Sequence, residues 1–101
     1  MLLYEKRKNT MIVRLSGDLD HSTASAIREE VDGLILDPGI RRLVFDLNDL
    51  EFMDSSGIGL MIGRYKLMAR RGGTMAVMSP RRRVDRIFEM AGLYELVERL
   101  A

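Results

Sequence analysis

Residues 43–66 read LVFDLNDLEFMDSSGIGLMIGRYK, a predicted strand, a polar turn and a predicted helix in direct succession. Residues 43–47 are almost continuously apolar, which is typical of a strand that is covered on both faces or lies centrally in a sheet. After MDSSG the apolar side chains recur with helical spacing. They are Ile58, Met61, Ile62, Tyr65, Met68 and Ala69. Gly72 and Gly73 end this helix, because glycine adopts the left-handed C-cap conformation at little cost.

The chain before this unit predicts two short strands and a helix. Residues 2–5 and 11–15 are the strands, and the polar turn between them suggests an antiparallel hairpin that ends at Ser16-Gly17. A helical stripe follows, made of Ala24, Ile27, Val31, Leu34 and Ile35. Ser22 or Thr23 is placed to cap the start of that helix.

The chain after the central unit predicts one more strand and one more helix. Residues 75–78 form the strand, and Pro80 opens the helix, where its missing N–H costs little. The apolar stripe of this helix is Val84, Ile87, Phe88 and Ala91, and Gly92 ends it. The tail LYELVERL (93–100) fits either a short helix or a strand plus a turn, and the pattern does not decide between them.

The order of elements, β-β-α-β-α-β-α plus a tail, predicts the fold class. Strands that alternate with helices are parallel neighbours joined by right-handed crossovers. If successive strands add in one direction, each crossover helix falls on the same face. We therefore expect one α/β domain over residues 1–101, with a small mixed sheet of four to five strands and helices packed mainly on one face.

Composition restricts the class of protein. Apolar residues make up 47% and charged residues 31% of the chain, which is ordinary for a globular domain, and the net charge of +1 favours neither nucleic acid nor an anionic membrane. The absence of cysteine excludes disulfides and cysteine-ligated metals. No apolar run is long enough to span a bilayer, and the N-terminus lacks the order of a secretory signal, so we expect a cytoplasmic location. Arg81, Arg82 and Arg83 are better explained as a solvated helix surface than as a nucleic-acid contact.

The residues of the central turn suggest two kinds of catalytic or ligand site. A serine hydrolase could use Ser55 with His21, the only histidine, but the Gly-x-Ser-x-Gly elbow is absent. Gly57, Gly59 and Gly63 have neither the dinucleotide nor the Walker spacing. A nucleotide or small-ligand sensor in another signalling complex is the alternative function, and the serine hydrolase is less favoured.

A metal site is weaker still. Asp18, Asp20 and His21 share one loop, yet carboxylates at a helix entry are explained by the helix dipole. We expect no catalytic residue, no metal and no cofactor.

The turn itself admits a regulatory role. Ser55 or Ser56 is expected to cap the helix that starts near Gly57. One cap does not explain two serines beside Asp54. A phosphate attached here would meet free N–H groups and the positive end of the helix, so the fold could tolerate it. Its charge of about −1.5 to −2 would still change the surface that a partner meets.

Three stretches carry a resemblance to a known family: LSGDLDHSTA (15–24), residues 43–66, and IFEMAGL (87–93). Together they resemble the STAS domain of bacterial anti-sigma factor antagonists, in particular the sporulation type that acts on the anti-sigma factor of the forespore sigma factor F. The likeness covers nearly the whole chain. Asp-Ser-Ser-Gly-Ile-Gly with its preceding strand is the specific part, whereas Gly-Asp-Leu-Asp alone would be weak.

The resemblance implies a partner-switching cycle. The unmodified antagonist binds an anti-sigma factor that is also a serine kinase, and the sigma factor is displaced. The kinase uses ATP to phosphorylate the antagonist, which then dissociates, and a serine phosphatase restores it. The modified serine of the family corresponds to Ser55. Partner contacts are expected at Asp20, His21, Asp54, Ser56, Gly57 and Ile58, with no nucleic acid and no membrane involved.

Overall fold

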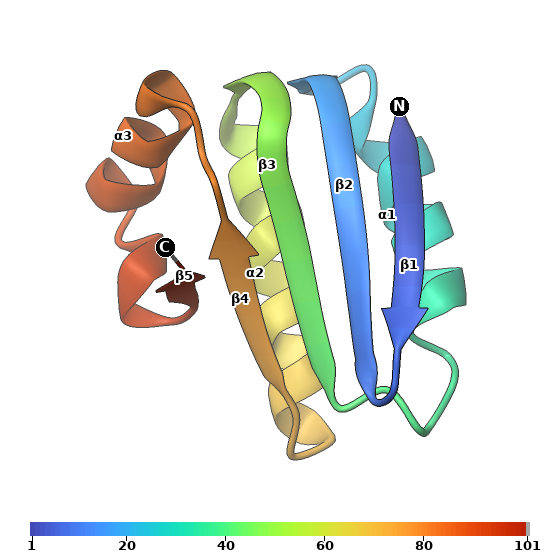
Figure 1. The fold of residues 1–101 in the computed structure, drawn as a ribbon. Coiled ribbons are helices and arrows are strands. Elements are labelled where there is room, and N and C mark those ends of the chain that lie inside the picture. The colour runs from blue at the N-terminus through green and yellow to red at the C-terminus, as the bar shows by residue number, and fades with distance from the viewer. Residues whose placement is uncertain (101) are drawn as a thin grey trace.

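The computed structural model describes residues 1–100 and arranges five strands of this part of the chain in one mixed sheet (Figure 1). The elements are β1 (Leu2–Arg7), β2 (Thr10–Leu19), α1 (Ala24–Leu34), β3 (Arg42–Met53), α2 (Ser55–Arg70), β4 (Thr74–Met78), α3 (Arg82–Met90), the 3-10 helix η1 (Leu93–Glu95) and β5 (Glu98–Leu100). The strands lie in the order β1-β2-β3-β4-β5; β1 runs antiparallel to β2, and the other neighbours are parallel. The predicted α/β class and mixed sheet are confirmed.

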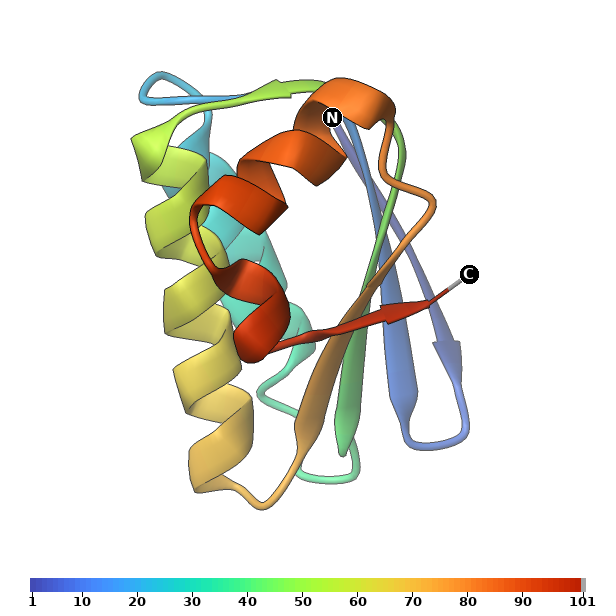
Figure 2. The same cartoon turned by 90° about the vertical axis from the view of Figure 1, so that its left-hand side faces the viewer.

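The three α-helices of residues 1–100 lie on one side of the sheet (Figure 2). This follows from the strand order, because each right-handed crossover to the next strand in the same direction returns the helix to the same face. Val13, Phe45 and Val77 are neighbours in register on the three central strands, and all three are fully buried beneath the helices. Val84 and Phe88 bring α3 into the same core.

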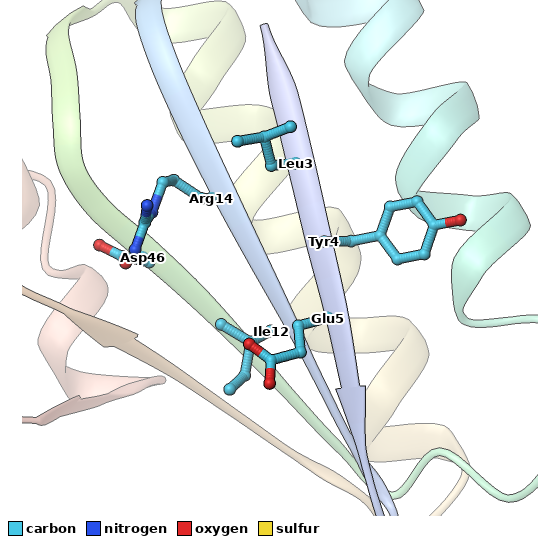
Figure 3. A pocket seen from close by; sticks show the side chains of 6 residues that line it. All are labelled: Leu3, Tyr4, Glu5, Ile12, Arg14 and Asp46. Carbon is cyan, nitrogen blue, oxygen red and sulfur yellow. Dashed lines mark hydrogen bonds and ion pairs between the residues drawn. The ribbon is translucent and has the colours of Figure 1, made fainter.

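The other face of the sheet carries no helix. Figure 3 shows the side chains of Leu3, Glu5, Ile12, Arg14 and Asp46 on this face. They line a hollow of about 150 Å³. Arg14 and Asp46 form an ion pair across it at 3.1 Å, and Leu3 beside them is exposed. The hollow lies away from the loops that carry the predicted site.

Strands β2 and β3 are longer than the sequence predicts. They pair from Thr10 to Leu19 of β2, with one register shift between Arg14 and Ser16 and a second between Gly17 and Asp18. Gly17 lies within the shifted region with φ +80°, a left-handed conformation that glycine adopts without strain. The second half of the pairing ends with Leu19 opposite Met53, so both strands reach the same edge together.

The tail contains both of the structures left open by the sequence, a short 3-10 helix and then a strand. Gly92 ends α3 in the left-handed conformation, with φ 72°, as the sequence predicts. Asp85 of α3 accepts hydrogen bonds from the Tyr94 hydroxyl of η1 and from Arg99 Nε of β5, the latter at 3.0 Å. These two hydrogen bonds attach the tail to the last α-helix. Ala101 lies outside the described residues.

Candidate functional site

The predicted site residues lie where β2 and β3 end. Parallel neighbouring strands have their carboxyl ends at one edge of the sheet, which is where loops of α/β folds form binding sites. The backbone N–H of Asp54 donates to the carbonyl oxygen of Leu19 at 3.3 Å. The N–H of His21 donates to Asp54 Oδ2 at 3.1 Å. The loop at Asp20–His21 and the start of α2 are therefore joined directly.

Asp54 is the N-cap of α2. Its Oδ1 accepts from the backbone N–H of Ser56 at 2.8 Å and of Gly57 at 3.4 Å. The prediction that Ser55 or Ser56 caps this helix is wrong. The extended backbone of Asp54 aims its carboxylate at the free N–H groups, and aspartate is as good an N-cap as serine. Within residues 1–100 no hydrogen bond of either serine hydroxyl is recorded.

The two serines differ in exposure. Ser55, the first residue of α2, is exposed, whereas Ser56 is half-buried. The hydroxyl of Ser55 is therefore both accessible and uncommitted. Helix dipoles place positive charge at such a terminus, so an anion on Ser55 meets a favourable field.

Gly57 lets the start of α2 approach the loop after β2. A Cβ at this position would lie 2.8 Å from the carbonyl oxygen of Leu19 and would overlap the side chain of Met53. Ile58 is half-buried and packs against the core, and its N–H donates to the carbonyl oxygen of Asp54 at 3.0 Å. Gly57 and Ile58 therefore fix the position of the start of α2 and offer no polar side chain to a partner.

The loop before α1 is organised by Asp20. Its Oδ1 accepts hydrogen bonds from the hydroxyl and N–H of Ser22 and from the N–H of Thr23. The Ser22 hydroxyl is the first cause, and the backbone N–H groups add to it, in holding the pKa of Asp20 below its ordinary value. The expected side-chain cap is absent: Thr23 occupies the N-cap position, but its hydroxyl donates to the carbonyl oxygen of Asp18 instead.

A groove between α1 and α2 opens beside this edge, with a volume of about 510 Å³. Its lining includes His21, Arg28, Ser56, Gly59, Gly63 and Arg64. The sequence did not single out Arg28 or Arg64. Arg64 is buried, although the arginine side chains of an amphipathic helix are normally exposed to solvent. The available signal was the spacing of Gly59 and Gly63, four residues apart on one helical face.

The geometry does not form a catalytic triad. No hydrogen bond between Ser55 and His21 is recorded within residues 1–100, and the carboxylate of Asp54 binds backbone N–H groups rather than the imidazole. The same residues contain no group of three or more His, Asp or Glu side chains that could hold a metal ion. Across that part of the chain, none of the helices combines the length and the apolar character that crossing a bilayer requires.

The model of the STAS domain family matches residues 2–101. An anti-sigma F factor antagonist of Paenibacillus polymyxa is 42% identical over 92% of this chain and 80% of its own length.

Two solved structures of the antagonist SpoIIAA have the same fold. The unphosphorylated form has a TM-score of 0.85 at 27% identity and covers all of this chain and 89% of its own. The phosphorylated form from Bacillus has a TM-score of 0.77 at 26% identity and covers 100% of this chain and 92% of its own. With the family model spanning all but its first residue, the chain belongs to the STAS domain family.

Proposed function

We propose that this protein is an anti-sigma factor antagonist that is switched by phosphorylation of Ser55. One observation carries the proposal: Ser55 is exposed at the start of α2, and Asp54 performs the capping that would otherwise occupy a serine hydroxyl. The relatives support it, since one is named for antagonism of an anti-sigma factor and another is described in a phosphorylated form.

The electrostatics of the site suit a switch that spares the fold. A phosphate on Ser55 would add a charge of about −1.5 to −2 at the positive end of a helix of 16 residues. The modified residue lies next to Asp54, so two negative groups would face the partner together. A partner surface that accepts a neutral hydroxyl has to desolvate this added charge, and an unpaired buried charge costs about 3–5 kcal/mol.

The cycle assigns a role to each partner. A serine-kinase anti-sigma factor binds the unmodified form and later phosphorylates it, and a serine phosphatase removes the phosphate. The antagonist is a regulator and a substrate, not an enzyme, and it acts in the cytoplasm, where sigma factors meet RNA polymerase. Its contact surface is formed by Asp20, His21, Asp54 and Ser56 around Ser55, and Gly57 and Ile58 belong to it by fixing the position of the start of α2.

Phosphorylation by the purified kinase tests the proposal. The protein is incubated with its cognate anti-sigma factor and ATP, and the modified residue is identified by mass spectrometry. Wild type and Ser56→Ala should both take up one phosphate, whereas Ser55→Ala should take up none. Circular dichroism checks that both variants fold. Phosphate on Ser56 alone, or on neither serine, would contradict the proposed site.

A further inference from the structure

The groove between α1 and α2 is continuous with the switch. Ser56 directly follows Ser55 and belongs to the lining of the groove, which continues along α2 to Arg64. The nine steps along the helix from Ser55 to Arg64 span roughly 13 Å. The two helices lie side by side on the helix-bearing side of the sheet (Figures 1 and 2).

At two positions of α2, no neighbouring atom of the fold requires a glycine. A Cβ added at Gly59 or at Gly63 would meet no atom within 4 Å, in contrast to Gly57, where it would strike the neighbouring loop. Glycine in a helix interior is less stable than alanine because it loses more backbone freedom on folding. Both residues line the groove, so their missing side chains leave the helix backbone open to another molecule.

Arg64 provides a second, independent observation. Only 8% of the residue is exposed, and its Nε lies 3.0 Å from Asp32 Oδ1 in an ion pair in which neither atom makes a hydrogen bond within residues 1–100. Its Nη1 is buried and has no hydrogen-bond partner within residues 1–100. Buried donors in native proteins are nearly always paired. An arginine fork beside a groove is suited to a carboxylate, which accepts two parallel N–H bonds.

The charge of the groove selects an anion. Arg28 and Arg64 line it, and no aspartate or glutamate within residues 1–100 does so, although Asp32 pairs with Arg64 from outside the lining. Arg28 is exposed on α1 and lines the groove together with Gly59 and Gly63 of α2. A free inorganic anion would be bound by the two arginines alone and would not require an uncovered helix backbone. The two glycines, one helical turn apart, indicate a ligand that also lies along the helix.

We propose that this groove receives an acidic segment of the anti-sigma factor, with an aspartate or glutamate side chain paired to Arg64 and Arg28. The segment lies against the helix backbone at Gly59 and Gly63. This inference rests on the proposed function and names the chemistry of its partner. It also extends the interface from the phosphorylated end of α2 to the middle of that helix.

Substituting alanine for the two glycines distinguishes an effect on partner binding from an effect on folding. Gly59→Ala and Gly63→Ala should each raise the melting temperature of the free protein, because alanine favours the helix. The double variant should bind the cognate anti-sigma factor at least tenfold more weakly than wild type. Gly33→Ala is the matched control: Gly33 is a helical glycine, exposed like Gly59, with nothing within 4 Å of an added Cβ, and it does not line the groove. It should gain stability and keep its affinity.

Charge reversal tests the anion. Arg28→Glu should weaken binding at least tenfold, and the loss should shrink as salt is raised. Arg70→Glu, an exposed arginine in the last turn of α2, makes the same change of charge outside the groove and should change affinity less than threefold. The affinity is measured by calorimetric titration of purified anti-sigma factor into each variant.

The possible results distinguish this inference from the proposed function. If wild type binds the anti-sigma factor and the glycine and Arg28 variants bind equally well, the groove is not part of the interface and the antagonist function stands. If wild type does not bind at all, both proposals fail. If inorganic phosphate binds saturably to wild type but not to Arg28→Glu, while affinity for the anti-sigma factor is unchanged, the groove holds a small anion and the inference is overturned.

Discussion

Replacing Asp54 by alanine removes the carboxylate that connects the two loops of the site. Three backbone N–H groups lose their acceptor: those of Ser56 at 2.8 Å, Gly57 at 3.4 Å and His21 at 3.1 Å. The first two are the cap of α2, and loss of a helix N-cap costs about 0.5–2 kcal/mol. The third joins the loop before α1, and one such hydrogen bond contributes about 0.5–1.5 kcal/mol.

The free energy of unfolding of Asp54→Ala should therefore fall by about 2 kcal/mol. For a domain of this size, each kcal/mol lowers the melting temperature by roughly 4–8 °C, so the expected shift is roughly 8–16 °C. Asp54→Ser should recover most of the loss, because serine is an equally good N-cap. It should not recover the bond to the N–H of His21, which the shorter hydroxyl does not reach.

Urea unfolding followed by circular dichroism measures these differences. Asp18→Ala is the control, since Asp18 is exposed in the neighbouring segment and no hydrogen bond of its carboxylate is recorded within residues 1–100. Its stability should stay within about 0.5 kcal/mol of wild type. If Asp54→Ala loses no more than Asp18→Ala, the carboxylate does not hold the site together and the assignment of the cap is refuted.

Three further predictions concern the support of the site and of the tail. Gly57→Ala should destabilise the protein by about 1–3 kcal/mol in urea, because its Cβ would lie 2.8 Å from a backbone carbonyl oxygen; unchanged stability would contradict that close approach. Arg71→Ala should cost about 2–3 kcal/mol, because its guanidinium donates to three backbone carbonyls of the α1–β3 connection. Arg71→Lys should recover part of the lost stability. If Arg71→Ala is as stable as wild type, the guanidinium does not hold the α1–β3 connection in place. The hydrogen bond from Tyr94, and after it the contact with Arg99, lowers the pKa of Asp85 below 3.8. The charged Asp85 carboxylate therefore stabilises the fold above about pH 4, and this stabilisation is lost as the pH falls through the lowered pKa. The stability gap between wild type and Asp85→Asn should be constant from pH 7 to 5 and close below pH 4; a gap that persists at pH 2 would contradict this.

The order of elements could be predicted because it is encoded locally. Helical spacing of apolar residues and glycines at the helix ends mark each element without reference to distant partners. The sheet followed from that order, since right-handed crossovers leave few arrangements for parallel strands. The juxtaposition of Asp20–His21 with Asp54 follows from the same rule, because the carboxyl ends of β2 and β3 meet at one edge.

Other features depend on tertiary contacts that no local pattern contains. The polar residues Asn48, Asp49 and Glu51 interrupt the apolar run, so the far half of β3 does not read as a strand; pairing with the bulged end of β2 makes it one. Serine and aspartate are similar N-caps, and only the backbone geometry of Asp54 shows which side chain reaches the helix. The burial of Arg64 depends on how closely α1 packs against α2.

The affinity of the anti-sigma factor for three forms of this protein tests the central claim most directly. Unmodified wild type and Ser55→Ala should bind with equal affinity, and wild type phosphorylated on Ser55 should bind at least a hundredfold more weakly. An unpaired charge in the interface costs about 3–5 kcal/mol, and each 1.4 kcal/mol is a factor of about ten. The melting temperature of the phosphorylated form should stay close to that of the unmodified protein, because the start of α2 favours negative charge. Equal affinity of the phosphorylated and unmodified forms would contradict the switch.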